Sequence, residues 1–132
     1  MSEKVFTIEE AQEHISWLIN EIESIIPKRN SIRDLQRQID ELVSRMAGNG
    51  GQNSHNKLEE FQKELNKVSQ DIKKVVSAIS KRGILIKGID PFLVDFPHKM
   101  DARLVYLCWT EGETSIKFWH EIDIGFQGRQ TL

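Results

Sequence analysis

The residues best suited to chemistry lie in the last third of the chain. This stretch holds the only cysteine, Cys108, the only tyrosine, two of the three tryptophans and four of the six phenylalanines. Thiolate and imidazole are the ligands that soft metals such as zinc prefer. A metal site would therefore combine Cys108 with His120, if the fold brought them together.

A second combination consists of His120, Glu121 and Asp123 with Asp95. Imidazole and carboxylates together can hold a divalent metal or perform general acid and base chemistry. For both His120 and Asp95, a structural role is favoured over a functional one. A histidine beside a carboxylate on a strand commonly serves as a hydrogen-bonded packing residue, and Asp95 could cap a turn before Phe96-Pro97.

Strands must position these residues, and the sequence predicts three of them. Residues 84–87 are short and rich in β-branched types, and residues 87–91 have the composition of a turn. Residues 103–109 and 114–121 are rich in aromatic and branched residues. They predict a β-hairpin around a turn at residues 110–113.

The register of this hairpin decides whether Cys108 can meet His120. With the turn centred on residues 111–112, Arg103 lies opposite His120 and Cys108 lies opposite Ser115. Cys108 and His120 would then be roughly 17 Å apart, at ~3.4 Å per residue, with side chains on opposite faces. Zinc ligands must lie about 2 Å from one ion. This register argues against a shared site and predicts a buried, inert Cys108.

The segment from Gly125 to Arg129 has two interpretations. Its glycines could wrap backbone amides around an anion, with Arg129 as a clamp. No strand-to-helix junction with Lys-Ser or Lys-Thr follows, however, as a phosphate loop requires. We therefore favour a turn that folds the tail back and pairs Arg129 with Asp95, Glu113 or Glu121.

Ionisable groups are dense among the aromatic residues of this region, so some of them must be partly buried. Buried charges must pair, shift their pKa or bind something. One interpretation is a polar pocket for a small polar or anionic ligand or a metal; the favoured one is a closed ion-pair lattice neutralised by Arg103 and Arg129. The candidate ligand-binding residues are Asp95, Glu113, His120, Glu121, Asp123 and Arg129, of which His120, Glu121 and Asp123 are the metal candidates.

Two long helices precede this region. Thr7 and Glu10 have the spacing of a capping box, so the first helix should begin at Ile8. Apolar residues then recur at alternating spacings of three and four, from Ile8 to Ile25 and again from Ile32 to Met46. This pattern draws one apolar seam along a helix.

Pro27 falls inside that pattern. A proline lacks the amide hydrogen and its ring clashes with the carbonyl four residues back. Ile25 and Ile32 are nevertheless one heptad apart, so the seam keeps its phase across the proline. A kinked but continuous helix is favoured over a turn between two helices.

Residues 47–56 contain three glycines and no periodicity, which predicts a loop tip. Asn56 and Glu59 predict a second capping box, and a second seam runs from Leu58 to Ile79. A left-handed Gly83 should end this helix. The two helices should form an antiparallel hairpin over residues 7–82.

Charge and composition exclude several classes of protein. The chain has 18 basic and 20 acidic residues among 132, and both signs alternate along both helices. This pattern argues against a nucleic-acid partner. The N-terminus lacks a secretory signal, and no apolar run approaches the ~20 residues that cross a membrane. A lone cysteine favours the reducing cytoplasm.

Several short motifs stand out along the chain, at residues 7–11, 93–97, 107–109, 112–113, 119–121 and 125–129. Together they resemble a known family, the uncharacterised prokaryotic proteins grouped as domain of unknown function 2203. The resemblance covers the whole chain, with departures at Phe92, where glycine is expected, and in the tip at residues 47–56. It supports the architecture and implies no reaction, because the family's activity is unknown.

The sequence thus predicts a single α+β domain over residues 1–132: a helical hairpin, kinked at Pro27, and a small antiparallel sheet within a β-rich part at 84–132. The expected function is a small cytoplasmic binding or assembly module with a polar pocket and no required cofactor. The alternative is a small metal-dependent or acid/base enzyme using Asp95, His120, Glu121 and Asp123.

The expected partner is a second copy of the chain. Some apolar residues lie off the two seams and widen the apolar face of the hairpin, which a second hairpin would cover most simply. A homodimer is therefore predicted, with no nucleic acid and no membrane. The off-seam residues are Ile19, Ile26, Val43 and Val76.

Overall fold

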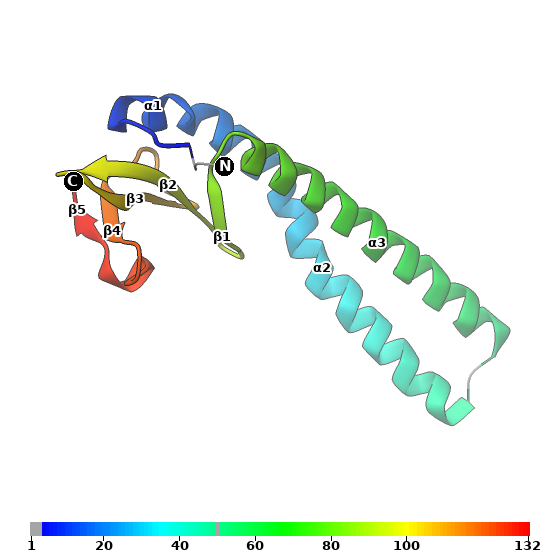
Figure 1. The fold of residues 1–132 in the computed structure, drawn as a ribbon. Coiled ribbons are helices and arrows are strands. Elements are labelled where there is room, and N and C mark those ends of the chain that lie inside the picture. Colours follow the sequence, from blue (N-terminus) through cyan, green and yellow to red (C-terminus); the bar gives the residue numbers. More distant parts are fainter. Residues whose placement is uncertain (1–3, 50) are drawn as a thin grey trace. The chain divides into compact units, whose positions relative to one another are not determined.

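A computed structural model describes residues 4–49 and 51–132. As predicted, the fold is α+β, with two long helices followed by an antiparallel sheet (Figure 1). The chain forms two compact units, the helical unit Ser24–Val75 and a unit that joins the residues up to Glu23 with Val76–Leu132. The elements are α1 (Ile8–Glu13), α2 (Ile15–Asn49), α3 (Gln52–Lys81), β1 (Leu85–Ile89), β2 (Phe92–Met100), β3 (Arg103–Thr110), β4 (Phe118–Glu121), the 3₁₀ helix η1 (Phe126–Gly128) and β5 (Gln130–Thr131).

The first helix begins at Ile8, as predicted. The Glu10 amide donates to the Thr7 hydroxyl at 3.0 Å, and the Thr7 amide donates to the Glu10 carboxylate at 2.8 Å. His14 then separates α1 from α2, because its amide donates to the Ala11 carbonyl at 3.1 Å, one residue closer than in an α-helix. The predicted single helix is thus two helices that share one buried seam.

Pro27 lies inside α2, which runs without interruption from Ile15 to Asn49. The prediction of a bent, continuous helix is confirmed. The missing amide of Pro27 costs one helical hydrogen bond, and the apolar seam keeps its phase on both sides. Among the described residues, no helix is long and apolar enough to cross a bilayer.

We expect Pro27→Ala to preserve the fold and to leave the melting temperature unchanged or raise it. Alanine restores the amide that can donate to the Glu23 carbonyl and removes the clash of the proline ring. Thermal unfolding followed by circular dichroism measures this change. A sharp fall in melting temperature would mean that the helix depends on the proline.

The connection between the long helices is shorter than predicted. Residues 47–56 were expected to form a loop tip, but α2 extends to Asn49 and α3 begins at Gln52. Asn56 lies inside α3, so the predicted capping box of Asn56 with Glu59 is wrong. Each added residue gains a helical hydrogen bond, which offsets the poor helix propensity of glycine and asparagine. Gly50 lies outside the described residues.

Within the helical unit, α2 and α3 run antiparallel (Figure 1). The Lys28 ammonium lies 2.8 Å from the Asp71 carboxylate and links the two helices. Towards the connection, Leu58, Phe61 and Leu65 are only half-buried. The seam of α3 is thus less covered near the connection than farther along the helix. The buried seam residues of the helical unit are Ile25, Ile39, Leu42, Val68 and Ile72.

Gly83 ends α3 in the left-handed conformation, with φ of 87°, as predicted. Its amide donates to the Ser80 carbonyl at 3.0 Å. A Cβ at this position would lie 2.9 Å from the Cβ of Lys4, so both the backbone angle and the space require glycine. The chain then turns directly into β1.

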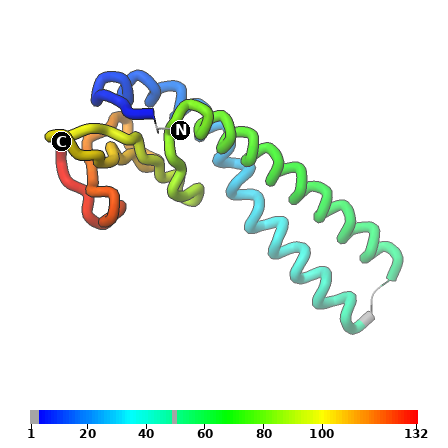
Figure 2. The backbone as a smooth tube through the Cα atoms, viewed as in Figure 1, coloured from blue at the N-terminus to red at the C-terminus, as the bar shows by residue number. Residues whose placement is uncertain are grey.

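The sheet has the order β1-β2-β3-β4-β5 with antiparallel neighbours, and Figure 2 lets the chain be followed through it towards the C-terminus. One face is the core and packs against the N-terminal segment, where the rings of Phe6 and Phe96 lie 5.2 Å apart. The other face, which we call the outer face, carries the alternate side chains. The core face is built by Phe92, Val94, Phe96, Val105, Leu107 and Trp109, all at most 1% exposed.

Strand β2, next to the central strand β3, was not predicted, because Asp95 was expected to cap a turn before Phe96-Pro97. A proline inside a strand is also unusual. The register explains how β2 accommodates it. β1 pairs with β2 only from Phe92 to Asp95, so beyond that point this edge of β2 is open. The Pro97 carbonyl accepts there from the Phe6 amide at 2.7 Å, and the missing proline amide leaves no strand partner unsatisfied.

The predicted hairpin register is wrong by three residues. β3 does pair with β4, but Tyr106 lies opposite His120, and residues 111–117 form the connection. The Gln12 side chain explains the longer connection. Its amide donates to the Ile116 carbonyl at 2.8 Å and accepts from the Ile116 amide at 3.0 Å, in place of a β3 partner.

Candidate metal centre

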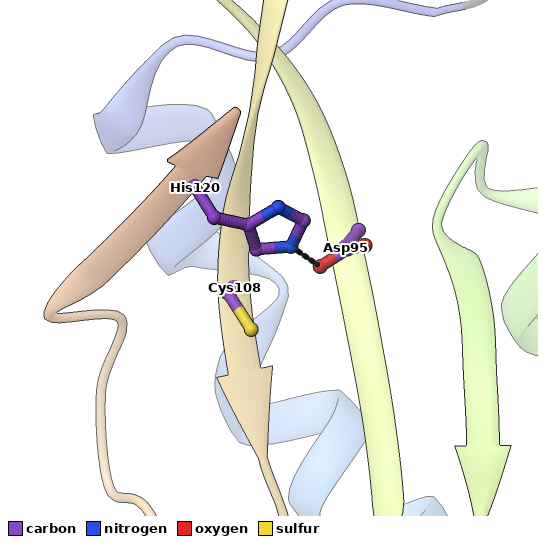
Figure 3. Close-up of side chains that lie close together, drawn as sticks. All are labelled: Asp95, Cys108 and His120. Atoms are coloured by element: carbon purple, nitrogen blue, oxygen red, sulfur yellow. Dashed lines mark hydrogen bonds and ion pairs between the residues drawn. The ribbon is translucent and has the colours of Figure 1, made fainter. Parts of the chain in front are cut away.

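Three potential metal ligands converge on the outer face of the sheet: Asp95 from β2, Cys108 from β3 and His120 from β4 (Figure 3). One ligand atom of each lies within 4.8 Å of the other two. The residues are 2%, 0% and 3% exposed, respectively, so all three polar groups are withdrawn from water. Such groups require specific partners.

The strand register creates this cluster. Asp95 lies directly opposite Cys108, and His120 lies opposite Tyr106, two residues from Cys108 along β3. All of these side chains therefore point to one face. The predicted separation of Cys108 from His120 is wrong, because a shift of three residues is odd and moves every β4 side chain to the other face.

Hydrogen bonds fix the orientation of the His120 ring. Nδ1 lies 2.8 Å from the Glu121 carbonyl oxygen, which can only accept, so Nδ1 carries the proton. Nε2 then faces the Asp95 carboxylate oxygen at 3.0 Å. Without a metal, one proton must lie between these two atoms. The predicted role of Asp95 as a turn cap is wrong, because Asp95 lies in mid-strand and bonds His120.

Burial favours the protonated forms of the two acidic groups. It raises the pKa of Asp95, an effect that the neighbouring His120 opposes. It also raises the pKa of the Cys108 thiol to about 12, and the Asp95 carboxylate adds to this increase. A free Cys108 thiol therefore remains protonated and a poor nucleophile at neutral pH.

The donor set fits a soft divalent metal ion. In a tetrahedral zinc site the ligand atoms lie about 2.0–2.3 Å from the ion, hence about 3.4–3.7 Å from each other. The 3.0 Å from His120 Nε2 to Asp95 and the 4.8 Å limit of the cluster bracket that spacing. Only small side-chain movements would be required. The bond from Nδ1 to the Glu121 carbonyl is the support that metal-binding histidines commonly receive.

The same geometry does not suit a nucleophilic relay. In a Cys-His-Asp relay, the thiol lies at one ring nitrogen and the carboxylate at the other. Here the two nitrogens of His120 bond the Glu121 carbonyl and Asp95. The three side chains meet at one point, which is the arrangement of ligands around an ion.

Other side chains lie next to the cluster. The ring of Tyr106 meets the His120 ring edge-on, with centroids 5.6 Å apart. The ammonium of Lys87 lies 5.1 Å from the centre of the Tyr106 ring. Arg129 donates to the Cys108 carbonyl at 3.2 Å and so contacts the backbone of a candidate ligand.

Two other candidate residues, Glu113 and Arg129, form an ion pair outside the cluster. Arg129 Nη2 lies 2.7 Å and 2.9 Å from the two Glu113 carboxylate oxygens, and its guanidinium stacks on Phe118 at 4.1 Å. The prediction that the tail folds back and pairs Arg129 with an acid is confirmed. Gly125, with φ of 78°, opens the turn into η1.

The remaining candidates, Glu121 and Asp123, do not join the cluster. The Glu121 carboxylate pairs with Arg103 at 2.9 Å near the surface, and Asp123 is exposed beyond the end of β4. Of the three metal candidates His120, Glu121 and Asp123, only His120 belongs to the converging group, and it is joined there by Asp95 of the wider candidate set. Cys108 was rejected as a ligand because the predicted register was incorrect. The sequence did place Tyr106 and Cys108 on one face of the same strand, which is the face that His120 joins.

Comparison with known proteins places the whole chain in one group. A family model described as an uncharacterized conserved protein, DUF2203, matches residues 4–132. This match confirms the resemblance drawn from the short motifs. No curated protein and no solved structure matches the chain.

Proposed function

Because the chain belongs to the family of uncharacterised conserved proteins DUF2203, whose description states no activity, we propose a function from the site itself: a small cytoplasmic module that binds a soft divalent metal ion through Asp95, Cys108 and His120. The observation that carries this proposal is the convergence of the three buried ligand atoms within 4.8 Å. Three strands supply one ligand each, so the folded sheet presets the site.

The donor chemistry favours zinc over other common ions. Thiolate excludes magnesium and calcium, which prefer oxygen ligands, and one imidazole with one carboxylate completes a mixed set that zinc accepts. An aspartate and a thiolate also neutralise the two positive charges of the ion. This balance matters because the site is buried.

An enzymatic role is the second possibility for the same residues. Three protein ligands leave a fourth position for water or substrate, as in catalytic zinc sites. The near-complete burial of the three ligands gives a substrate little access, which ranks a binding role first. An enzyme using Asp95 and His120 would not use Glu121, which is paired with Arg103, or the exposed Asp123.

Metal content separates the proposed ligands from the other candidates. Wild-type protein is dialysed against limiting zinc, and its metal content is measured by mass spectrometry. We expect about one zinc ion per chain. His120→Gln should lose that ion, since the amide is a poor ligand. Asp123→Asn is the matched control and should retain it. Wild-type protein that retains no zinc, or equal retention by both variants, would contradict the proposal.

The exposed apolar surface of the helices supports self-association as a second function. Val43 is 49% exposed on α2, and near the connection Leu58, Phe61 and Leu65 of α3 remain half-buried. A second helical unit would cover these side chains with least exposure to water. The proposed partner is another copy of the chain.

We expect light scattering at micromolar concentration to give twice the 15.3 kDa mass of the chain. Val43→Glu should reduce the mass to that of a monomer, because it places a charge on the proposed interface. Gln38→Glu adds the same charge at another exposed position of α2 and is the control. A monomeric wild type would contradict self-association without affecting the metal proposal.

A further inference from the structure

Among the described residues, no fourth His, Cys, Asp or Glu side chain joins the proposed metal centre. The converging group consists of Asp95, Cys108 and His120 only. Glu113, an acid on the connection after β3, is held by Arg129 and also accepts from the Thr110 amide at 2.8 Å. The fourth position of a four-coordinate site is thus open to a small molecule from solution.

A cation, Lys87, lies close enough to the cluster for its charge to act on Asp95. Lys87 lies between the paired residues Ile86 and Gly88, where β1 has an irregular register against β2. Bulges of this kind redirect side chains and recur next to functional sites. The Lys87 ammonium lies 5.1 Å from the Tyr106 ring, which in turn contacts His120, and its charge acts on Asp95.

Lys87 forms no ion pair in the part of the chain that the structure describes, although its charge acts on Asp95. Its ammonium lies over the face of the Tyr106 ring. The charges of a loaded centre also leave this cation unbalanced, because Asp95 and the Cys108 thiolate together cancel a divalent ion. The ammonium is thus available to a negatively charged ligand.

We infer that the metal centre binds a small carboxylate at its fourth position, with Lys87 as the cation that holds the second carboxylate oxygen. The inference rests on the proposed metal site and names the class of ligand that the site selects. The burial of Asp95, Cys108 and His120, each at most 3% exposed, restricts the ligand to a small one. A negative charge is favoured over neutral water because it pairs with Lys87.

Cobalt-loaded protein tests this inference with acetate as the probe. Thiolate-bound cobalt gives a charge-transfer band, and its visible d–d bands respond to exchange of one ligand. At constant ionic strength, we expect acetate to shift the visible bands of wild-type protein in a saturable manner. Lys87→Met should bind cobalt normally and raise the acetate midpoint about tenfold or more. Lys99→Met is the control, because Lys99 is an exposed lysine of β2 on the same outer face of the sheet as Asp95, and this variant should behave as wild type.

Each contrary outcome has a distinct meaning. Visible bands that do not respond to acetate in wild-type protein would overturn the carboxylate inference and leave the metal site standing. An unchanged acetate midpoint in Lys87→Met would overturn the role of Lys87 and with it the inference. Absence of the thiolate-to-cobalt band would overturn both the metal site and the inference that rests on it.

Discussion

Replacing Cys108 by alanine is expected to weaken zinc binding more than about 100-fold. Loss of a group that merely supports a metal ligand commonly costs 10–100-fold in affinity, so loss of the ligand itself should cost more. Competition with a chromophoric chelator measures this affinity. Asp123→Ala is the control, because the exposed Asp123 was a candidate ligand on sequence grounds and lies outside the converging group.

The same variant should also lose the stabilisation that zinc gives to the fold. A ligand that binds only the native state adds about 2.7 kcal/mol to the free energy of unfolding at 100 times its dissociation constant. Zinc should therefore raise the melting temperature of wild-type protein and leave that of Cys108→Ala almost unchanged. Equal affinity and equal stabilisation in both proteins would show that zinc binds elsewhere.

Arg129→Met is expected to lower the free energy of unfolding by about 3 kcal/mol, because removing one partner leaves a largely buried Glu113 carboxylate without its counter-ion. Their side chains are 15% and 19% exposed. Arg129 also closes the tail over Phe118 and Phe126, at 4.1 Å and 4.8 Å from the two rings. Urea unfolding followed by tryptophan fluorescence measures the loss.

A double variant separates the unpaired charge from the lost packing. Arg129→Met with Glu113→Gln should be more stable than Arg129→Met alone, because the uncompensated carboxylate is gone. Both variants should still bind zinc, since neither residue is a proposed ligand. An Arg129→Met protein as stable as wild type would mean that the Glu113 pair does not hold the tail in place.

The helical part of the fold follows from local rules that the sequence displays. Thr7 with Glu10 fixes the first helix start, the apolar seam passes Pro27 in phase, and Gly83 ends α3. Each of these features depends on residues a few positions apart. The Gly-rich segment at 47–56 was wrongly predicted to be a loop. A glycine in a helix costs only about 1 kcal/mol relative to alanine, and the hydrogen bonds of neighbouring turns can offset this cost.

The sheet depends on contacts between distant residues, and this is where prediction failed. Strand β2 contains Pro97, which a strand accepts only where the missing amide has no partner. Here β1 pairs with β2 no farther than Asp95, and the Pro97 carbonyl accepts from the Phe6 amide, more than 90 positions away. The register of β4 depends on Gln12, which binds the backbone of Ile116. Neither contact can be read from strand propensity or turn composition.

The error in the β4 register also made the predicted site incomplete. Asp95 and His120 were recognised as candidates from their residue types, and Arg129 was correctly expected to hold the tail. Cys108 was set aside because an odd shift in register reverses the face of every side chain on a strand. The sequence alone could therefore name candidate residues, but only the strand pairing shows which of them lie together.

X-ray absorption at the zinc edge of the loaded wild-type protein tests the metal site most directly. The proposed ligands Asp95, Cys108 and His120 predict one sulfur atom at about 2.3 Å and nitrogen or oxygen atoms at about 2.0–2.2 Å, with the multiple scattering of a single imidazole. Cys108→Ala should lose the sulfur shell. A wild-type spectrum with only nitrogen and oxygen neighbours would contradict zinc binding by this cluster.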